Sequence, residues 1–230
     1  MREGRADYGM APVENSLAGG IHAVWDLLAE QSPPVVGELY FHVKHFLIGH
    51  PGSRVEQIRQ AASHIQALAQ CAAYLQRLGI ETVEEYDTAG AVALVKARGN
   101  AQEAAIAPAA AAQLYDMEIL AENIQTDARN YTRFLIISHG QEALPPGDQP
   151  LKTTLIADLS DCASQLAPML NALGDCELSK VETRKLHDKP WAYRCYIECM
   201  GTVENDELKR FSAHADRLCQ LAPYPTCTQP

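Results

Sequence analysis

Three short polar stretches carry the side chains best suited to chemistry, and the first is VENSLAGG at residues 13–20. It places Glu14, Asn15 and Ser16 ahead of a pair of glycines, after a short apolar run. Backbone amides at the start of a helix bind anions, and glycine lets a ligand approach the backbone. A plain Asn or Ser helix cap before a glycine turn gives the same pattern, and the spacing alone favours that simpler interpretation.

The second stretch is SHIQALAQC at residues 63–71. Ser63 and Gln66 have the spacing of a capping box, in which the serine bonds the third amide of a helix and the glutamine reaches back. That interpretation explains both residues without a ligand. It leaves His64, whose imidazole either takes part in proton transfer or lies at the surface.

The third stretch is NYTRF at residues 130–134, which runs directly into the apolar residues of FLII. A threonine hydroxyl can donate a hydrogen bond to a leaving oxygen, and an arginine can pair with a carboxylate. Loops that enter buried strands hold ligands in many α/β proteins. The alternatives are therefore a site edge at Thr132 and Arg133, or a solvated loop edge with Phe134 beginning a core strand.

The composition indicates a globular protein whose ligands are not nucleic acids. The chain has 230 residues, 47% of them hydrophobic and 21% charged, with a net charge of −10 that argues against nucleic acid or an anionic membrane as partner. No apolar run approaches the ~20 residues of a membrane span, and the charged start is unlike a signal peptide. The seven cysteines form no Cys-x-x-Cys pair, which favours reduced thiols, no zinc site and a cytoplasmic location.

The elements that must position these stretches alternate between strand and helix in the first 139 residues. This order predicts an α/β region with a mainly parallel sheet. Each helix is expected from apolar residues on one face, and each strand from β-branched, aromatic or small apolar runs. The expected strands are 8–14, 35–49 and 103–107, and the expected helices are 21–30, 63–79, 88–99 and 108–117.

The last third of the chain has a different order. GQEALPPGDQP at residues 140–150 carries three prolines and two glycines, so it is the predicted linker between two domains, 1–139 and 151–226. The order βαββαβ after it predicts a ferredoxin-like fold. The expected elements, in order, are 152–160, 162–174, 177–187, 191–201, 205–218 and 219–225.

Four blocks in register resemble prephenate dehydratase across residues 3–137. They are GRADYGMAPVENSLAGGIHAVWDLL, HVKHFLIGHPG, SHIQALAQCAAYL and AAIAPAAAAQLYDMEILAENIQTDARNYTRFLII. Residues 151–225, including the closing LAPYP, are similar to the ACT regulatory domain that follows in that family. The resemblance implies an α/β catalytic region of two lobes, like a type II periplasmic binding protein, and a ferredoxin-like ACT domain.

The family resemblance implies the conversion of prephenate to phenylpyruvate, with loss of water and carbon dioxide and without a cofactor or a metal. Loss of the ring carboxylate pushes electrons toward the carbon that bears a hydroxyl. That hydroxyl leaves when a proton or a strong hydrogen bond is donated to it, so the protein mainly orients the substrate and stabilises the departing oxygen.

The roles of individual residues follow from the same resemblance. Thr132 is expected to hydrogen-bond the leaving hydroxyl, with Glu14 and His64 completing a relay. Arg133 is expected to pair either with a substrate carboxylate or with the protein itself. The substrate-binding residues implied are Asn15, Ser16, Ser63, Gln66, Arg133 and Phe134.

The sequence departs from the family at its front. Family members begin with a strand and a Gly-Pro-x-Gly-Thr turn ahead of the point that matches Met1, so one lobe is expected to be incomplete. Three interpretations stay open: a misplaced start codon, a second chain that supplies the missing part, or a remnant with little activity. A second departure is Ile65, where the family usually has proline; this is tolerable in a first helical turn.

The ACT region departs at its effector stretches. The residues aligned with the family's phenylalanine site are Ser164, Gln165, Leu166, Glu182 and Arg184. Serine and glutamine replace the small Gly and Ala where an effector needs room, which argues against phenylalanine as a feedback effector. For Glu182 and Arg184 the alternative is a cross-strand surface pair. ACT domains generally associate side by side, so a homodimer or homotetramer is expected.

Two alternatives accompany the dehydratase hypothesis. Arogenate dehydratase acts on a substrate that differs by one amino group, and the sequence does not separate the two. The other alternative is a non-catalytic protein that senses an amino acid or regulates a partner. Asn15, Gln66 and Thr132 favour the enzyme, whereas the shortened front and the altered effector stretch favour the sensing protein.

Overall fold

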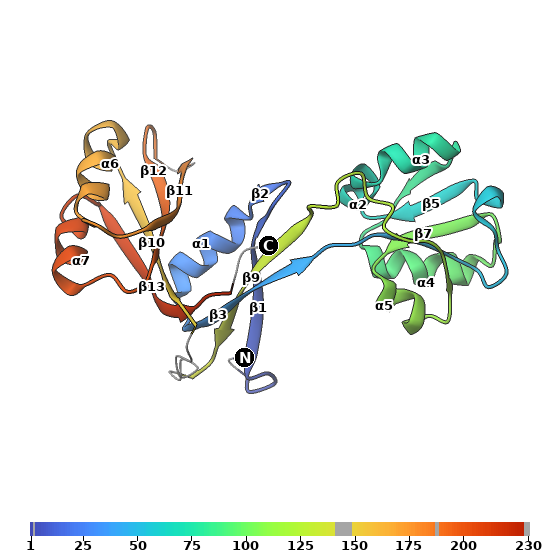
Figure 1. Ribbon diagram of the computed structural model, residues 1–230, viewed down its shortest axis with the longest axis horizontal. Coiled ribbons are helices and arrows are strands. Elements are labelled where there is room, and N and C mark those ends of the chain that lie inside the picture. Colours follow the sequence, from blue (N-terminus) through green and yellow to red (C-terminus); the bar gives the residue numbers. More distant parts are fainter. Residues whose placement is uncertain (2, 141–148, 187–188, 228–230) are drawn as a thin grey trace. The chain divides into compact units, whose positions relative to one another are not determined.

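A computed structural model describes residues 1, 3–140, 149–186 and 189–227 (Figure 1). Contacts divide the chain into two compact units. Unit 1 comprises Met1–Phe41 and Thr132–Pro230, and unit 2 comprises His42–Tyr131. The residues singled out by sequence are therefore shared between the units, with Glu14, Asn15 and Thr132 in the first and His64 and Gln66 in the second.

The first sheet of unit 1 has four strands in the order β2-β1-β9-β3. Strand β1 (Tyr8–Asn15) pairs antiparallel with β2 (Gly19–Gly20) and with β9 (Tyr131–Ser138), and β3 (Val35–His42) lies at an edge. The register of β1 on β9 shifts between Pro12 and Glu14, so Val13 is an extra residue that forms a β-bulge. Bulges turn the side chains beyond them, and they often lie beside functional sites.

Helix α1 (His22–Gln31) follows this hairpin and buries one face. The buried residues are Trp25, Leu28 and Ala29, of which Trp25 and Leu28 lie at the predicted helical spacing. The helix ends at Ser32, which has left-handed φ and ψ angles of 43° and 50°. The predicted strand at 8–14 and the predicted helix at 21–30 are confirmed.

The second sheet of unit 1 is built from residues 151–225. Its antiparallel strands lie in the order β11-β12-β10-β13, and its chain order is βαββαβ, so the predicted ferredoxin-like fold is confirmed. One face of the sheet packs on the two helices through Leu155, Met169 and Phe211. The elements are β10 (Leu151–Leu159), α6 (Cys162–Asn171), β11 (Leu178–Lys185), β12 (Tyr193–Met200), α7 (Asn205–Ser212) and β13 (Arg217–Pro225).

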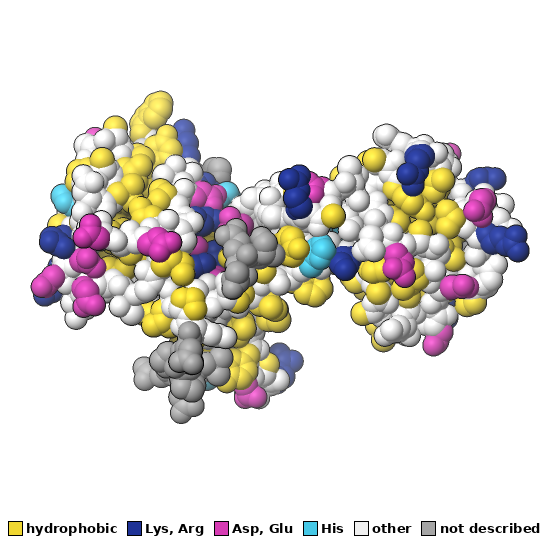
Figure 2. Space-filling model, viewed as in Figure 1, with side chains coloured by type: hydrophobic (Ala, Val, Ile, Leu, Met, Phe, Trp, Pro, Cys, Tyr) yellow, Lys and Arg dark blue, Asp and Glu magenta, His cyan; other side chains and the backbone are white. Residues whose placement is uncertain are grey.

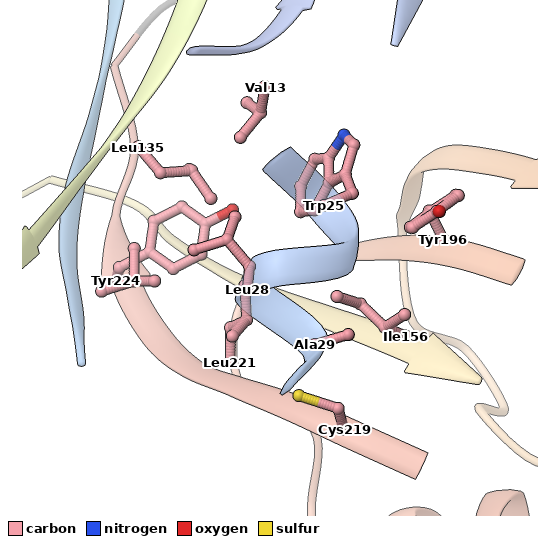
Figure 3. Packing of buried hydrophobic residues seen from close by; sticks show 11 residues of the cluster. Val13, Trp25, Leu28, Ala29, Leu135, Ile156, Tyr196, Cys219, Leu221 and Tyr224 are labelled. Carbon is pink, nitrogen blue, oxygen red and sulfur yellow. The ribbon is translucent and has the colours of Figure 1, made fainter. Parts of the chain in front are cut away.

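The other face of this sheet shares a core with helix α1 and the first sheet. Ile156, Tyr196 and Leu221 pack with Trp25 and Leu135 in one buried cluster (Figure 3). Trp25 and Tyr196 are fully buried, with ring centroids 5.6 Å apart. Because this core joins both sheets, the ferredoxin-like part belongs to the same compact unit as residues 1–41. Most of the predicted linker at 140–150 lies outside the described residues, and the domain limits 1–139 and 151–226 stay predictions.

Unit 2 contains a five-stranded sheet in the order β6-β5-β7-β4-β8. Parallel pairing is confined to β5 with β6 and β7, while β4 is antiparallel to β7 and β8, so the sheet is mixed rather than mainly parallel. The strands are β4 (Phe46–Gly49), β5 (Gln60–Ser63), β6 (Glu81–Glu84), β7 (Glu103–Ala107) and β8 (Glu118–Ala121).

Helices cover both faces of this sheet (Figure 1). Leu68 and Leu75 pack on one face and Val92 and Val95 on the other. This arrangement explains why residues 104–107 of β7 are all apolar, since strands buried on both faces do not alternate. The helices are α2 (Ile65–Gln70), α3 (Ala72–Leu78), α4 (Thr88–Arg98) and α5 (Ala109–Leu114), with a 3-10 turn, η1 (Val55–Gln57).

Two predicted elements prove to be divided. The run 35–49 is not one strand, because β3 ends at His42 in one sheet and β4 begins at Phe46 in another. The predicted helix 63–79 starts at Ile65 and is interrupted at Cys71, whose φ of −106° and ψ of 8° are not helical. Ser63 ends strand β5 instead of starting the helix.

Charged side chains are distributed over both units. On the face shown in Figure 2, acidic and basic side chains are interspersed instead of forming one acidic field. An anionic ligand would need local donors to hold it, since the net charge of −10 would not attract it. Within the described part of the chain, no helix has the length and apolar character needed to cross a membrane.

Candidate active site

Asn15 and Thr132 face each other at the ends of strands β1 and β9. They are direct partners in the antiparallel register, and the Asn15 Nδ2 group donates to the Thr132 Oγ1 atom over 3.2 Å. Since the threonine oxygen accepts this bond, the hydrogen of its hydroxyl is left to donate to another group. This is the polarity needed to stabilise a departing oxygen.

The orientation of the Asn15 amide is set by the turn that follows it. Its Oδ1 atom accepts from the backbone N–H of Leu17 at 3.1 Å and of Ala18 at 2.9 Å. Two amide donors on one end of the side chain fix that end as oxygen, so the NH₂ end points at Thr132. The simple interpretation of Asn15 as a helix cap is wrong, because the N-cap of α1 is Ile21. Ser16 is exposed within the same turn.

The two glycines after this turn serve the hairpin. Gly19 has a φ of 84°, a conformation that residues with a Cβ rarely adopt. A Cβ on Gly20 would lie 3.1 Å from both carboxylate oxygens of Glu182. Gly20 therefore gives a close approach to a carboxylate of the protein, where the sequence suggested a ligand.

Arg133 is buried and pairs with the protein. Its guanidinium donates to Glu38 at 2.7 Å, to Glu198 at 2.8 Å and to the Tyr224 hydroxyl at 3.1 Å. Burial works against the charge, yet the carboxylates of Glu198 and Glu38 hold the pKa of Arg133 above its ordinary value. Of the two alternatives left open by sequence, these contacts support pairing within the protein.

The carboxylates around Arg133 form a closed buried network. Glu38 also accepts from Lys152 at 2.9 Å and from the hydroxyl of Thr226. The side chains of Arg133, Glu38, Glu198 and Lys152 are exposed by 4%, 0%, 2% and 7%, so two positive charges balance two negative ones out of water. This network fixes the start of β9, directly beside Thr132. Phe134, which follows Arg133, is half-buried.

Glu14 lies between two cations on strand β1. Its carboxylate is 2.8 Å from the Lys180 ammonium and 3.6 Å from the Arg133 guanidinium. Side chains of neighbouring strand residues point to opposite faces, so Glu14 and Arg133 share one face of the ladder and Asn15 and Thr132 share the other. Glu14 therefore stabilises the β1–β9 ladder from the face opposite Asn15 and Thr132.

The candidates in unit 2 lie at the junction of β5 and α2. Ser63 is fully buried and donates to the carbonyl of Ile106 over 2.6 Å. The N-cap of α2 is His64, whose Nδ1 atom accepts from the Gln66 backbone N–H at 3.3 Å. The predicted capping box of Ser63 and Gln66 is therefore wrong, because the serine belongs to the strand. The Gln66 side chain is exposed.

The imidazole of His64 has a defined tautomer in this arrangement. Since Nδ1 accepts a hydrogen bond, the proton of the neutral ring is on Nε2, which is then a donor. The roles expected for Ser63, His64 and Gln66 stay predictions.

The five effector residues expected from sequence make contacts within unit 1. Ser164 and Gln165 form hydrogen bonds with Asp161, the N-cap of α6. Leu166 lies within the same helix. Glu182 and Arg184 point with Lys180 toward residues 1–41, and we call these three the inner face of β11. Glu182 and Arg184 bind helix α1 and not each other, so the cross-strand alternative is not observed. The contacts are Glu182–His22 at 2.6 Å and Arg184–Asp26 at 2.5 Å.

The sequence reasoning missed the partners that hold the site. Glu38 and Lys180 were not singled out, although Lys180, Glu182 and Arg184 recur at every second position of a strand. Charges with that period on a strand that packs against protein signal ion pairs across a buried surface. No such signal existed for Glu38, whose partners are distant in the chain.

Comparison with known proteins identifies the family. Residues 1–142 match the family model described as prephenate dehydratase. The chain belongs to the prephenate dehydratase family. It is 40% identical over 186 residues, 80% of this chain and 47% of the relative, to an Arabidopsis thaliana protein named arogenate dehydratase/prephenate dehydratase 1, chloroplastic.

Two further comparisons cover more of the chain. A Komagataeibacter europaeus protein named bifunctional N-acyl-homoserine lactone acylase/prephenate dehydratase is 36% identical over 212 residues, 91% of this chain and 75% of that one. A solved prephenate dehydratase from Arthrobacter aurescens, in complex with L-Phe, gives a TM-score of 0.82 at 26% identity, covering 100% of this chain and 80% of that one. The predicted fold class is thereby confirmed.

The chain spans about half the length of the plant relatives it matches.

Proposed function

We propose that this chain converts prephenate to phenylpyruvate by decarboxylating dehydration. The observation that carries the proposal is the Asn15–Thr132 pair, in which a fixed amide donates to the threonine oxygen over 3.2 Å. The hydroxyl hydrogen of Thr132 is then left to donate to a substrate oxygen. As the ring carboxylate leaves as carbon dioxide, its electron pair moves into the ring and the C–O bond of the hydroxyl breaks. Thr132 donates a hydrogen bond to that oxygen as negative charge develops on it.

The protein contributes orientation above all. The ring becomes aromatic in the reaction, so the driving force lies in the substrate, and the barrier is lowered by holding the substrate and stabilising one oxygen. The buried network behind Arg133 keeps β9 in place so that Thr132 is pre-organised. Substrate contacts by Ser16, Ser63, Gln66 and Phe134, and a relay through His64, are proposed from the family resemblance. Glu14 faces away from Thr132, so it is proposed to act on Thr132 through the β1–β9 ladder and not as a member of the relay.

The experiment that tests the proposal measures phenylpyruvate by its ultraviolet absorbance after incubation of the purified chain with prephenate. We expect Thr132→Ala to lower kcat by about 100-fold, since removing one donor from a developing oxyanion costs about that much, and Thr132→Ser to keep most of the activity. Val181→Thr, at an exposed position of β11, serves as the control. Equal activity of the parent and Thr132→Ala would refute the proposed role, and an inactive parent would favour the sensing alternative.

Arogenate is the second substrate to test under the same conditions. The plant relative carries both activities in its name, and arogenate differs from prephenate by one amino group. We propose that both compete for the same site. If Thr132→Ala lowers kcat/KM for prephenate and for arogenate by the same factor, the result would support one shared site.

The altered ACT-like part is proposed to retain a regulatory role. The solved relative in complex with L-Phe supports L-phenylalanine as effector, and the family resemblance supports a homodimer or homotetramer. Against this, Glu182 and Arg184 already bind α1. Titration calorimetry with L-phenylalanine, alongside light scattering for the oligomer, tests both points.

A cytoplasmic location is proposed from the cysteines, all seven of which are free.

A second candidate activity is hydrolysis of N-acyl-homoserine lactones, which the Komagataeibacter relative carries in its name. Unit 1 has an apolar groove of about 460 Å³ that an acyl chain would fit, lined in part by Val24, Leu27 and Ile137. We expect release of homoserine lactone, and a lower rate in Leu27→Asp than in the control Leu94→Asp, which changes an exposed position of α4. Absence of product from the parent would remove this candidate.

A further inference from the structure

Lys180 is a mostly buried cation on the inner face of β11. Its side chain is 11% exposed, and its ammonium lies 2.8 Å from Glu14 Oε1 and 3.0 Å from Glu182 Oε2. The same ammonium is 6.0 Å from the centre of the Trp25 ring, at cation–π range. A lysine with two carboxylates and an indole around it has lost most of its rotamer freedom, so its position is well defined.

The Glu14 carboxylate is held at both oxygens. One oxygen faces Lys180, and the other is 3.6 Å from Arg133, which is itself locked by Glu38 and Glu198. Glu14 therefore connects a residue of the ferredoxin-like sheet to the buried network at the start of β9. Its own side chain is one-third exposed, so removal of Lys180 would leave it free to turn into water.

These contacts lie on residues directly adjacent in the chain to those of the candidate active site. Glu14 precedes Asn15 on β1, and Arg133 follows Thr132 on β9, with Glu14 opposite Arg133 and Asn15 opposite Thr132. The β-bulge at Val13 weakens the ladder on the other side of Glu14. Lys180 and Arg133, which both contact Glu14, therefore hold the ends of β1 and β9 in the register that lets Asn15 reach Thr132.

We infer that Lys180 is a positioning residue, which acts through Glu14 to hold Asn15 against Thr132. This inference rests on the proposed function for its effect on activity. It places a residue of the ferredoxin-like sheet in control of a hydrogen bond at the candidate active site, although Lys180 lies on the opposite face of the β1–β9 ladder.

The test is a double-mutant cycle on kcat with prephenate. Lys180→Met is expected to lower kcat about tenfold with little change in KM, because a small displacement of a donor slows the chemical step. Lys180→Arg keeps the cation and is expected to restore most of kcat. In the Glu14→Gln background, Lys180→Met is expected to have no further effect. Lys185→Met, an exposed lysine of the same strand, is the matched control.

A second readout does not depend on activity. Hydrogen exchange of peptides covering 8–20 and 128–138 is expected to be faster in Lys180→Met than in the parent, and unchanged in Lys185→Met. An inactive parent with this exchange pattern would refute the proposed function and support the positioning role. Unchanged hydrogen exchange in Lys180→Met would overturn the inference. So would a double variant, Lys180→Met with Glu14→Gln, whose loss of kcat equals the product of the two single losses.

Discussion

Replacement of Arg133 by methionine tests the charge balance of the buried network. The parent holds Arg133 and Lys152 against Glu38 and Glu198, all nearly excluded from water. Methionine has a similar length without the charge, so the variant buries two carboxylates with one cation. Removal of one partner from a buried ion pair costs about 3–5 kcal/mol, and we expect the free energy of unfolding of unit 1 to fall by that amount.

The geometry says which carboxylate is left without a partner. Glu38 keeps Lys152 at 2.9 Å, whereas Glu198 loses its cation and keeps the Thr154 hydroxyl at 3.4 Å. Arg133→Met combined with Glu198→Gln restores neutrality. We therefore expect the double variant to be more stable than Arg133→Met alone by at least about 1 kcal/mol, in the range of couplings between residues in contact.

The assay is urea unfolding followed by tryptophan fluorescence. Both tryptophans, Trp25 and Trp191, lie in unit 1, so this signal reports that unit alone. Lys209→Met, which removes an exposed pair to Asp206, is the control and should leave the unfolding curve unchanged. A double variant no more stable than Arg133→Met would show that lost packing, and not unbalanced charge, causes the destabilisation.

The remaining predictions concern an amide, two thiols and a carboxylate. Asn15→Leu should lower kcat by about tenfold or more, measured by phenylpyruvate formation, because nothing then orients Thr132; a kcat equal to that of the parent would contradict this. Burial raises the pKa of the thiols of Cys71 and Cys195 to about 12, so both should resist iodoacetamide at pH 8 until urea unfolds the chain, as mass spectrometry can follow. Burial opposes ionisation of Glu182, but hydrogen bonds from His22 and Lys180 leave its pKa below the ordinary carboxyl value. Its contribution to stability is therefore present above that ordinary value and lost as pH falls through the folded pKa. Glu182→Gln should be less stable than the parent at pH 7 and converge with it in thermal melts once the pH is below the folded pKa of Glu182.

Much of the local structure was predictable because it depends on periodic patterns. The helical spacing of Ile21, Val24, Trp25 and Leu28 predicted the apolar face of α1, of which Trp25 and Leu28 are buried, and the order of strands and helices after residue 150 predicted the ferredoxin-like fold. Thr132 was placed correctly at the mouth of a strand, since a polar loop that enters an apolar run has few other arrangements. These features rest on interactions between residues close together in the chain.

Other features depended on contacts that no local pattern encodes. The run 35–49 is rich in β-branched and aromatic residues, yet His42 ends a strand in one sheet and Phe46 begins a strand in another, because strand pairing is chosen by distant segments. Ser63 and Gln66 have the spacing of a capping box, but Ser63 pairs with Glu84 in the β5–β6 ladder and therefore belongs to the sheet.

Local patterns of residues identified the side chains that are available for chemistry and the elements that carry them. The partners of those side chains followed only from the packing of the folded chain. Arg133 became part of a buried network because Glu38 and Glu198, 95 and 65 residues away, converge on it, and Asn15 meets Thr132 across 117 residues. Long-range electrostatic pairing of this kind has no period and no spacing, since its geometry is created only when the sheets pack together.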